Sequence, residues 1–134
     1  VDDLWKFDGS DWKQLRDIAD NDSDEDYDDD YAITRAGTVS FVIDGRGYIA
    51  TGTRSGVTSD YWVYDPEEDL WYGDSDDDYT PMTNVHNVSS GGSSRSYAVS
   101  FSTGKRGFVL SGSSGTSYFD DVYELLPYEQ EDVD

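Results

Sequence analysis

The sequence has no cysteine and few basic residues, with one histidine and nine lysines and arginines among its 134 residues. Without cysteine, the chain can form neither disulfide bonds nor thiolate metal sites. Its 30 acidic residues give a formal net charge of −21. This charge argues against nucleic acid or an anionic membrane as a partner, because phosphate binding requires Lys and Arg to replace counterions. Cations and basic surfaces remain candidate partners, and the simplest role of the acid is to keep the protein soluble.

Long apolar runs are also missing, and none approaches the roughly 18 residues of a membrane-spanning helix. We therefore expect no membrane insertion. The sequence shows neither a signal peptide nor an initiator methionine, so we expect that the natural N-terminus has been removed.

What the sequence does contain is an internal repeat with a fixed spacing. The stretch "RAGTVSFVIDGRGYIATG" at residues 35–52 returns as "RSYAVSFSTGKRGFVLSG" at residues 95–112. Related stretches, "SDYWVYDPEEDLW" and "FDDVYELLPYEQED", follow the two copies, and "VDDLWKFDGSDW" opens the chain. A fixed period of this length is typical of repeat architectures. The anchors that lie 60 residues apart are Arg35 and Arg95, Phe41 and Phe101, Gly47 and Gly107, and Gly52 and Gly112.

Each repeat unit has the pattern of short antiparallel strands. Segments such as "TVSFVI" and "YWVYD" are rich in β-branched and aromatic residues, and "DGRG" and "DPEED" between strands are typical of tight hairpin turns. No segment shows the apolar stripe of a helix. We therefore predict an all-β protein with two strands in residues 1–15, four in 36–72 and three in 96–126, which is nine in total.

The spacing of the aromatic anchors resembles that of kelch repeats. Tyr64 and Trp71 are separated by six residues, and the second strand of each unit ends in glycine, at Gly52 and Gly112. Kelch units usually have a double glycine where this chain has Thr-Gly and Ser-Gly. The units are most similar to those of kelch proteins of the bacterial cell envelope. The resemblance implies antiparallel four-stranded β-propeller blades. It also implies a secreted or surface-attached protein of bacterial type, located extracellularly or in the cell envelope, in the periplasm or on the outer surface.

About two blades cannot close a propeller, which usually needs four to eight. We therefore expect the chain to be the C-terminal portion of a longer propeller, with the remaining blades in the same parent chain. Self-assembly of several chains into a ring is the alternative. The predicted parts are strands three and four of a first blade at 1–19, an acidic loop at 20–34, a complete blade at 35–73, an acidic and Ser/Gly-rich loop at 74–94, and an incomplete last blade with an acidic tail at 95–134.

The two acidic loops carry most of the candidate binding features. Because they follow fourth strands, they should emerge on the same face as the loops after second strands, at 53–60 and 113–120. Long loops on a rigid scaffold commonly carry binding sites, so we predict that this long-loop face is functional. Alternating aspartates in the first loop are typical of a calcium site, and the alternative is a solvated loop that attracts cations loosely. These candidate calcium ligands are Asp20, Asp22, Asp24 and Asp26.

Aromatic and arginine side chains near these loops are the candidate ligand-binding residues. The tyrosines could stack on sugars or contact a protein, or pack against a blade edge instead. The arginines precede the first strands, where they could bind a carboxylate or phosphate, or else neighbouring carbonyls and acids. The candidates are Tyr27, Tyr31, Tyr79, Arg35 and Arg95. Five further aromatics are predicted to form the core between blades, and these are Trp5, Trp12, Trp62, Trp71 and Tyr123.

Enzymatic function has little support in this sequence. The copper chemistry of the galactose oxidase family, which shares the blade type, requires cysteine and more than the single His86. No nucleophile elbow accompanies His86, and no particular pair of carboxylates stands out for glycoside hydrolysis. We therefore predict a non-catalytic module without a cofactor other than calcium, which binds a protein or glycan through the long-loop face. The alternatives are a fragment of a carbohydrate-active propeller enzyme with its catalytic residues in missing blades, and a calcium-stabilised structural module.

Overall fold

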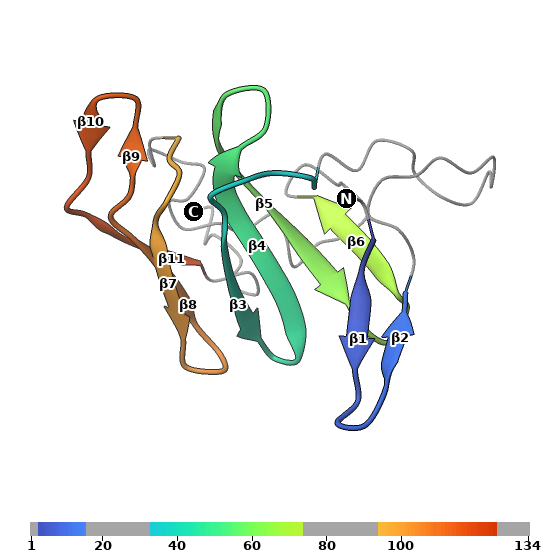
Figure 1. The fold of residues 1–134 in the computed structure, drawn as a ribbon. Coiled ribbons are helices and arrows are strands. Elements are labelled where there is room, and N and C mark those ends of the chain that lie inside the picture. The colour runs from blue at the N-terminus through green and yellow to red at the C-terminus, as the bar shows by residue number, and fades with distance from the viewer. Residues whose placement is uncertain (1–2, 16–32, 74–93, 126–134) are drawn as a thin grey trace, which may run out of the picture.

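The computed structural model of the chain describes residues 3–15, 33–73 and 94–125 (Figure 1). These residues form antiparallel strands and turns without any helix, which confirms the all-β prediction. Accordingly, the described part of the chain holds no helix that is long and apolar enough to cross a membrane.

Four consecutive strands form the larger sheet, in the order β3-β4-β5-β6. At the first turn, Ile43 pairs with Arg46 and leaves Asp44 and Gly45 as a two-residue loop. Both loop residues have positive φ, 48° and 78°, as a tight hairpin of this length requires. The predicted "DGRG" turn is therefore confirmed. The strands are β3 (Val39–Ile43), β4 (Arg46–Thr53), β5 (Val57–Asp65) and β6 (Leu70–Gly73).

The second sheet repeats this topology with one strand fewer. It has the order β7-β8-β11, and a two-stranded hairpin of β9 and β10 extends it (Figure 1). In the larger sheet, the pairing of β4 with β5 shifts register between Ala50 and Gly52, yet both strands continue. At the equivalent place the second sheet is divided, so β8 with β9 corresponds to β4, and β10 with β11 corresponds to β5. The strands are β7 (Val99–Ser102), β8 (Gly107–Leu110), β9 (Ser113–Ser114), β10 (Ser117–Tyr118) and β11 (Val122–Leu125).

This equivalence corrects one prediction. The sequence predicts long loops at 53–60 and 113–120, but more than half of the first segment and half of the second belong to paired strands. The turns themselves comprise residues 54–56 in the first unit and 115–116 in the second. Glycine and serine lower the strand propensity of these segments, but the backbone pairing of the preceding sheet simply continues to the tip.

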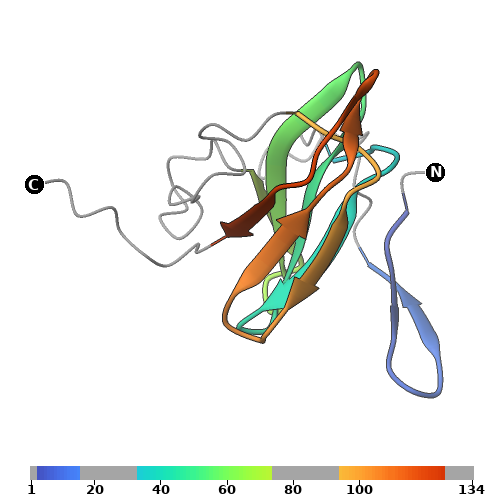
Figure 2. The ribbon, with the colours of Figure 1, turned by 90° about the vertical axis from the view of Figure 1, so that its left-hand side faces the viewer.

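The two sheets pack face to face (Figure 2), and their contact forms the core. Val39, Phe41 and Ile43 alternate along β3 and are all buried, together with Val109 and Leu125 of the second sheet. The sheets approach closely because the second has a glycine where they meet.

The first hairpin, of β1 (Trp5–Phe7) and β2 (Trp12–Gln14), stands apart from the two sheets (Figure 2). Every residue of both strands is exposed. The prediction that Trp5 and Trp12 belong to a core is therefore wrong, because the side chains remain 46% and 66% exposed and no described sheet covers them. Trp71 is buried as expected, whereas Trp62 and Tyr123 are half-buried.

The spacing of the aromatic anchors has a simple structural reason. Tyr64 and Trp71 are direct cross-strand partners on β5 and β6, with ring centroids 5.2 Å apart. Phe7 and Trp12 are partners in the same way on β1 and β2, at 5.0 Å. Pairs of aromatics across antiparallel strands stabilise a sheet by about 0.2–1 kcal/mol. The shorter spacing of the second pair reflects a shorter hairpin.

Candidate functional site

Most of the sequence-predicted binding residues lie outside the part of the chain that the structure describes. This applies to the aspartates proposed for calcium and to the three tyrosines of the acidic loops, as well as to His86. Their roles stay predictions. The residues concerned are Asp20, Asp22, Asp24, Asp26, Tyr27, Tyr31 and Tyr79.

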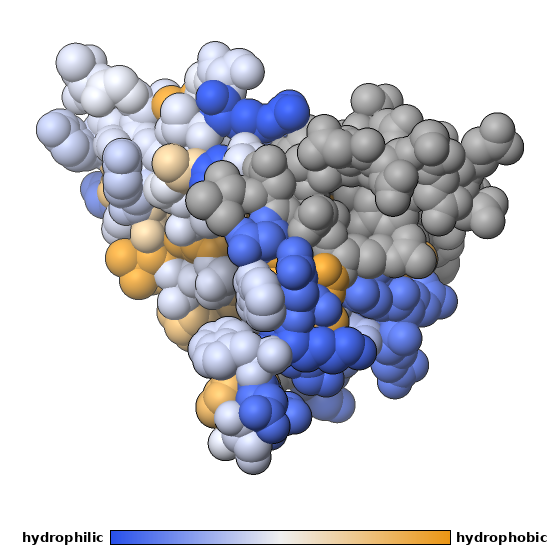
Figure 3. Space-filling view, turned by 45° about the vertical axis from the view of Figure 1, so that its right-hand side comes forward, coloured by the Kyte–Doolittle hydropathy of each residue, from blue (hydrophilic) through white to orange (hydrophobic). Residues whose placement is uncertain are grey.

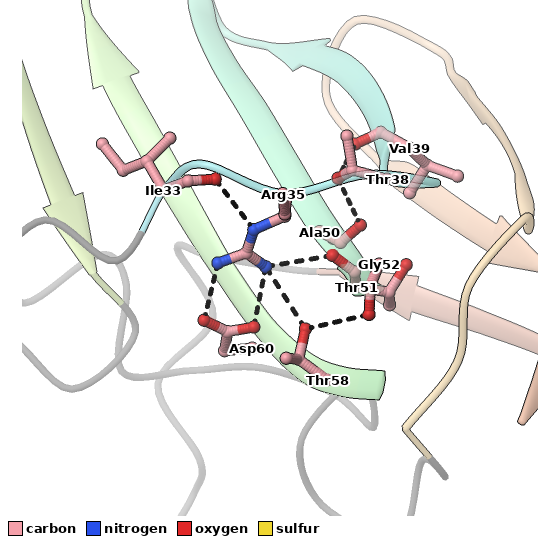
Figure 4. Close-up of polar contacts among 9 residues, drawn as sticks. All are labelled: Ile33, Arg35, Thr38, Val39, Ala50, Thr51, Gly52, Thr58 and Asp60. Carbon is pink, nitrogen blue, oxygen red and sulfur yellow. Dashed lines mark hydrogen bonds and ion pairs between the residues drawn. The ribbon is translucent and has the colours of Figure 1, made fainter. Parts of the chain in front are cut away.

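Arg35 is described in full, and each nitrogen of its guanidinium group donates a hydrogen bond to another group of the protein (Figure 4). Two parallel bonds join it to Asp60, from Nη1 to Oδ1 at 2.7 Å and from Nη2 to Oδ2 at 2.8 Å. Nη1 also donates to the Thr51 carbonyl at 3.0 Å, and Nε donates to the Ile33 carbonyl at 3.0 Å. The side chain is only 1% exposed. Such a two-bonded pair combines geometric specificity with charge, as arginine does best.

Arg95 makes the same arrangement 60 residues later. Nη1 and Nη2 donate to the two carboxylate oxygens of Asp121 at 2.5 and 3.0 Å, and Nη1 also donates to the Ser111 carbonyl at 2.8 Å. The guanidinium lies 4.5 Å from the centroid of the Phe119 ring and 4.9 Å from that of Tyr123, where cation–π attraction adds to the ion pair. We call these two groups the arginine clamps.

Each clamp holds a bulge in the second strand of its unit. The residues whose carbonyls accept from the arginines, Thr51 and Ser111, have φ of 60° and 58°, which is unusual for residues with a side chain. Gly52 and Gly112 follow with φ of 101° and 88°. A Cβ atom at Gly52 would lie 2.8 Å from the Ala36 carbonyl oxygen, so the close backbone approach requires glycine.

The clamps also control the ionisation of their carboxylates. Hydrogen bonds from Arg95 are the main reason why the pKa of Asp121 is lowered, although burial partly opposes them. For Asp60, burial acts to raise the pKa, but hydrogen bonds from Arg35 and Thr58 outweigh it and the net shift is downward. Both carboxylates are therefore held in the ionised form, and the ion pairs are complete at neutral pH.

These contacts give Arg35 and Arg95 a structural role, which is one of the two interpretations of the sequence. Ligand binding by the two arginines stays a prediction. The sequence alone does not indicate that Asp60 and Asp121 are the partners of these arginines. These aspartates lie 61 residues apart, whereas the repeat has a period of 60. The second hairpin, between β9 and β10, has one residue more than the first, so Asp60 and Asp121 do not align at the fixed spacing.

Beyond the clamps, the two hairpins extend from the same end of the sheets (Figure 1). We define this hairpin end as residues 54–56, β9, β10, and the segment around Tyr97 that precedes β7. Tyr97 is 76% exposed and Tyr118 is 86% exposed. The region of β9 and β10 is only weakly polar, as the pale upper left of Figure 3 shows, whereas strongly hydrophilic residues gather at the centre and lower right. The turns between β3 and β4 and between β7 and β8 lie at the opposite end (Figure 1).

Metal or acid–base sites receive no support from the described residues. Within residues 3–15, 33–73 and 94–125, no group of three or more His, Cys, Asp or Glu side chains is placed to hold a metal ion. A hollow at the end opposite the hairpin end is lined by Asp44, Arg46 and Asp65. There Arg46 Nε is 3.2 Å from Asp65 Oδ2, so these charges already compensate each other.

Comparison with known proteins gives no family for this chain. No protein-family model matches it, and no curated protein gives a significant match. The resemblance to kelch repeats therefore stays a prediction from the repeat and its aromatic spacing.

Proposed function

We propose that the chain is a non-catalytic binding or scaffold module, built from kelch-like propeller blades, that engages a protein or glycan through its hairpin end. The observation that carries this proposal is the pair of exposed tyrosines, Tyr97 just before β7 and Tyr118 on β10, each close in sequence to a residue of the second arginine clamp. A tyrosine ring offers apolar area for stacking together with a hydroxyl group for hydrogen bonding. It also orders few torsions when it binds, which favours its use in recognition surfaces.

The clamps support this proposal through rigidity. Each arginine ties the start of its unit to the bulge and to the third strand, which lies directly below the hairpin tip. A surface that is rigid before binding loses less conformational entropy when a ligand arrives. Between the units, the backbone of Arg95 accepts a hydrogen bond from the Gly52 amide at 2.7 Å and donates one to the Thr58 carbonyl at 3.0 Å, which holds the two hairpins in a fixed relation.

The blade architecture is part of the same proposal. Two units with the same strand order, stacked face to face, are what neighbouring propeller blades would look like. We propose that the remaining blades of the propeller come either from the same parent chain or from further copies of this chain, and that the protein is secreted or attached to the cell surface. The high acidic charge fits a basic protein surface as one class of partner.

Backbone amide chemical shifts test the hairpin end directly. Isotope-labelled protein is titrated with neutral oligosaccharides of defined length and, separately, with a lysine-rich peptide. We expect shifts for the amides of Gly56, Tyr97 and Tyr118, and we expect the double variant Tyr97→Ser, Tyr118→Ser to lose most of the affinity.

A matched control keeps the two ends of the sheets apart. The variant Phe7→Ser removes an aromatic side chain that is 51% exposed but lies on β1, far from the hairpin end in sequence. It should bind as the wild type does. If shifts gather instead at Asp44 and Gly45, or if the double variant binds unchanged, the hairpin end is not the binding surface.

A further inference from the structure

Two hydrogen bonds between the sheets each join residues that occupy equivalent positions of the repeat. The backbone amide of Tyr97 donates to the Gly37 carbonyl at 2.9 Å. The hydroxyl of Ser100 donates to the Ser40 carbonyl at 2.8 Å. The partners in each bond are 60 residues apart, so one unit is related to the next by a single step of the repeat. A contact between two different faces, made in one direction, can in principle be repeated without limit.

We call the face of β3 that carries Val39 and Phe41 the forward face of the first unit, and the equivalent face of β7 the forward face of the second. The contact between the sheets buries the first of these faces but not the second. On β3, Val39 and Phe41 are 5% and 7% exposed. Their equivalents on β7, Val99 and Phe101, are 62% and 50% exposed. Val122, which lies on the same face through its pairing in the β8–β11 ladder, is 58% exposed. Figure 2 looks onto this face, and no described strand lies in front of it.

The chain also carries the surface that would cover this face. Within the molecule, Phe41 packs against Gly107, where an added Cβ atom would lie only 2.4 Å from its ring. Gly47 is the equivalent of Gly107 and lies on the outer face of the larger sheet, next to Ile49. Among the residues that the structure describes, a Cβ atom there would meet nothing closer than Tyr64 Cβ, at 3.8 Å. The described part of the first unit therefore leaves room at the receiving position.

We propose that two copies of this chain associate head to tail, with Val99, Phe101 and Val122 of one copy packed against Gly47 and Ile49 of the other. The contact would continue the interface that already joins the two sheets. The charge on the forward face does not oppose it, because Arg106 and Glu124 form an ion pair there. Since the two faces differ, the association leads to a closed ring or an open chain of copies, depending on the rotation between them.

Light scattering after size exclusion tests the association, at an ionic strength high enough to screen the net charge. We expect the mass of the wild type to rise above 15.0 kDa with increasing protein concentration. Phe101→Lys blocks the forward face and Gly47→Lys blocks the receiving face, and each should stay at the mass of one chain. Phe101 is 50% exposed, and a Cβ atom at the half-buried Gly47 makes only an ordinary contact with the described residues, so near-ultraviolet circular dichroism should show a native fold. Ser55→Lys makes the same charge change at the hairpin end and should associate as the wild type does.

Mixing the two blocked variants distinguishes head-to-tail from symmetric association. Phe101→Lys keeps its receiving face and Gly47→Lys keeps its forward face, so an equimolar mixture should give a complex of two chains and nothing larger. A wild type that remains a single chain at millimolar concentration would overturn the proposal, and would leave a further unit of a longer parent chain as the occupant of this face. A mixture that stays at the mass of one chain would overturn it equally.

Discussion

At the scale of single residues, the arginine of each clamp is buried, whereas its aspartate partner is partly exposed. The arginine side chains are 1% and 2% exposed, whereas their aspartate partners keep 33% of their side-chain surface exposed. Removing a carboxylate would therefore leave a positive charge without its counterion in a place that water cannot reach. Breaking a buried ion pair in this way is far more destabilising than the small net value of the intact pair suggests.

We expect Asp121→Asn to lower the free energy of unfolding by about 3 kcal/mol, at the low end of the range for breaking buried pairs because Asp121 is partly exposed. Urea denaturation followed by tryptophan fluorescence measures the difference. Asp120→Asn is the matched control, because it makes the same charge change at an exposed neighbouring position. Equal stability of the two variants would show that the clamp contributes nothing.

The clamps also predict a pH dependence. In the folded chain the pKa of Asp121 lies below its ordinary value of 3.8. A carboxyl group with a lowered pKa stabilises the fold when ionised, so its contribution is present above the unfolded-state pKa and is lost as the pH falls through the folded-state pKa. We expect the stability difference between wild type and Asp121→Asn to be constant near neutral pH and to shrink below about pH 4. Urea denaturation at a series of pH values tests this, and a difference that persists at the lowest pH would contradict it.

At the scale of elements, the packing of the sheets depends on a glycine on β8. Gly107 and Gly47 occupy the same place in the repeat, but only Gly107 faces another sheet. An added methyl group at Gly107 must displace the Phe41 ring, and the ring is fixed in turn by stacking on Tyr48 at 5.6 Å. The same sequence position is therefore under different constraints in the two units.

We expect Gly107→Ala to lower the free energy of unfolding by about 1–3 kcal/mol, the usual cost of overpacking a core. Gly47→Ala is the internal control and should change stability far less, because its Cβ atom meets only an ordinary contact at 3.8 Å. Thermal unfolding of both variants at low protein concentration makes the comparison. Similar losses in both would mean that glycine is needed for the strand itself and not for the contact between sheets.

At the scale of the whole molecule, the repeat allowed much of the fold to be predicted. The nine predicted strands all have counterparts, because periodic apolar residues and turn residues specify hairpins locally. The extent of the hairpin tips was not predictable, since Gly and Ser are typical of loops even when neighbouring strands keep them paired. The exposure of Trp5 and Trp12 was not predictable either, because burial depends on a partner surface that lies elsewhere in the chain. The same holds for the aspartates of the clamps, which are distant in sequence.

The net charge of −21 acts on the molecule as a whole. Like charges destabilise a compact chain through mutual repulsion, and salt weakens this repulsion by shortening the screening length from about 30 Å at 0.01 M to about 8 Å at 0.15 M. We expect the thermal midpoint to rise between these two ionic strengths. Differential scanning calorimetry in sodium chloride measures it. A midpoint that falls would show that the attractive ion pairs outweigh the repulsion.

The one-residue difference between the two hairpins has a consequence for how this chain can be altered. Gly52 and Asp60 are eight positions apart, whereas Gly112 and Asp121 are nine apart, yet both clamps close in the same way. The tip thus absorbs a change of length without disturbing the sheets beneath it. Insertions are best tolerated at such exposed tips. The turn at residues 115–116 is accordingly the place where a foreign peptide could be grafted, with the two clamped strands holding its ends.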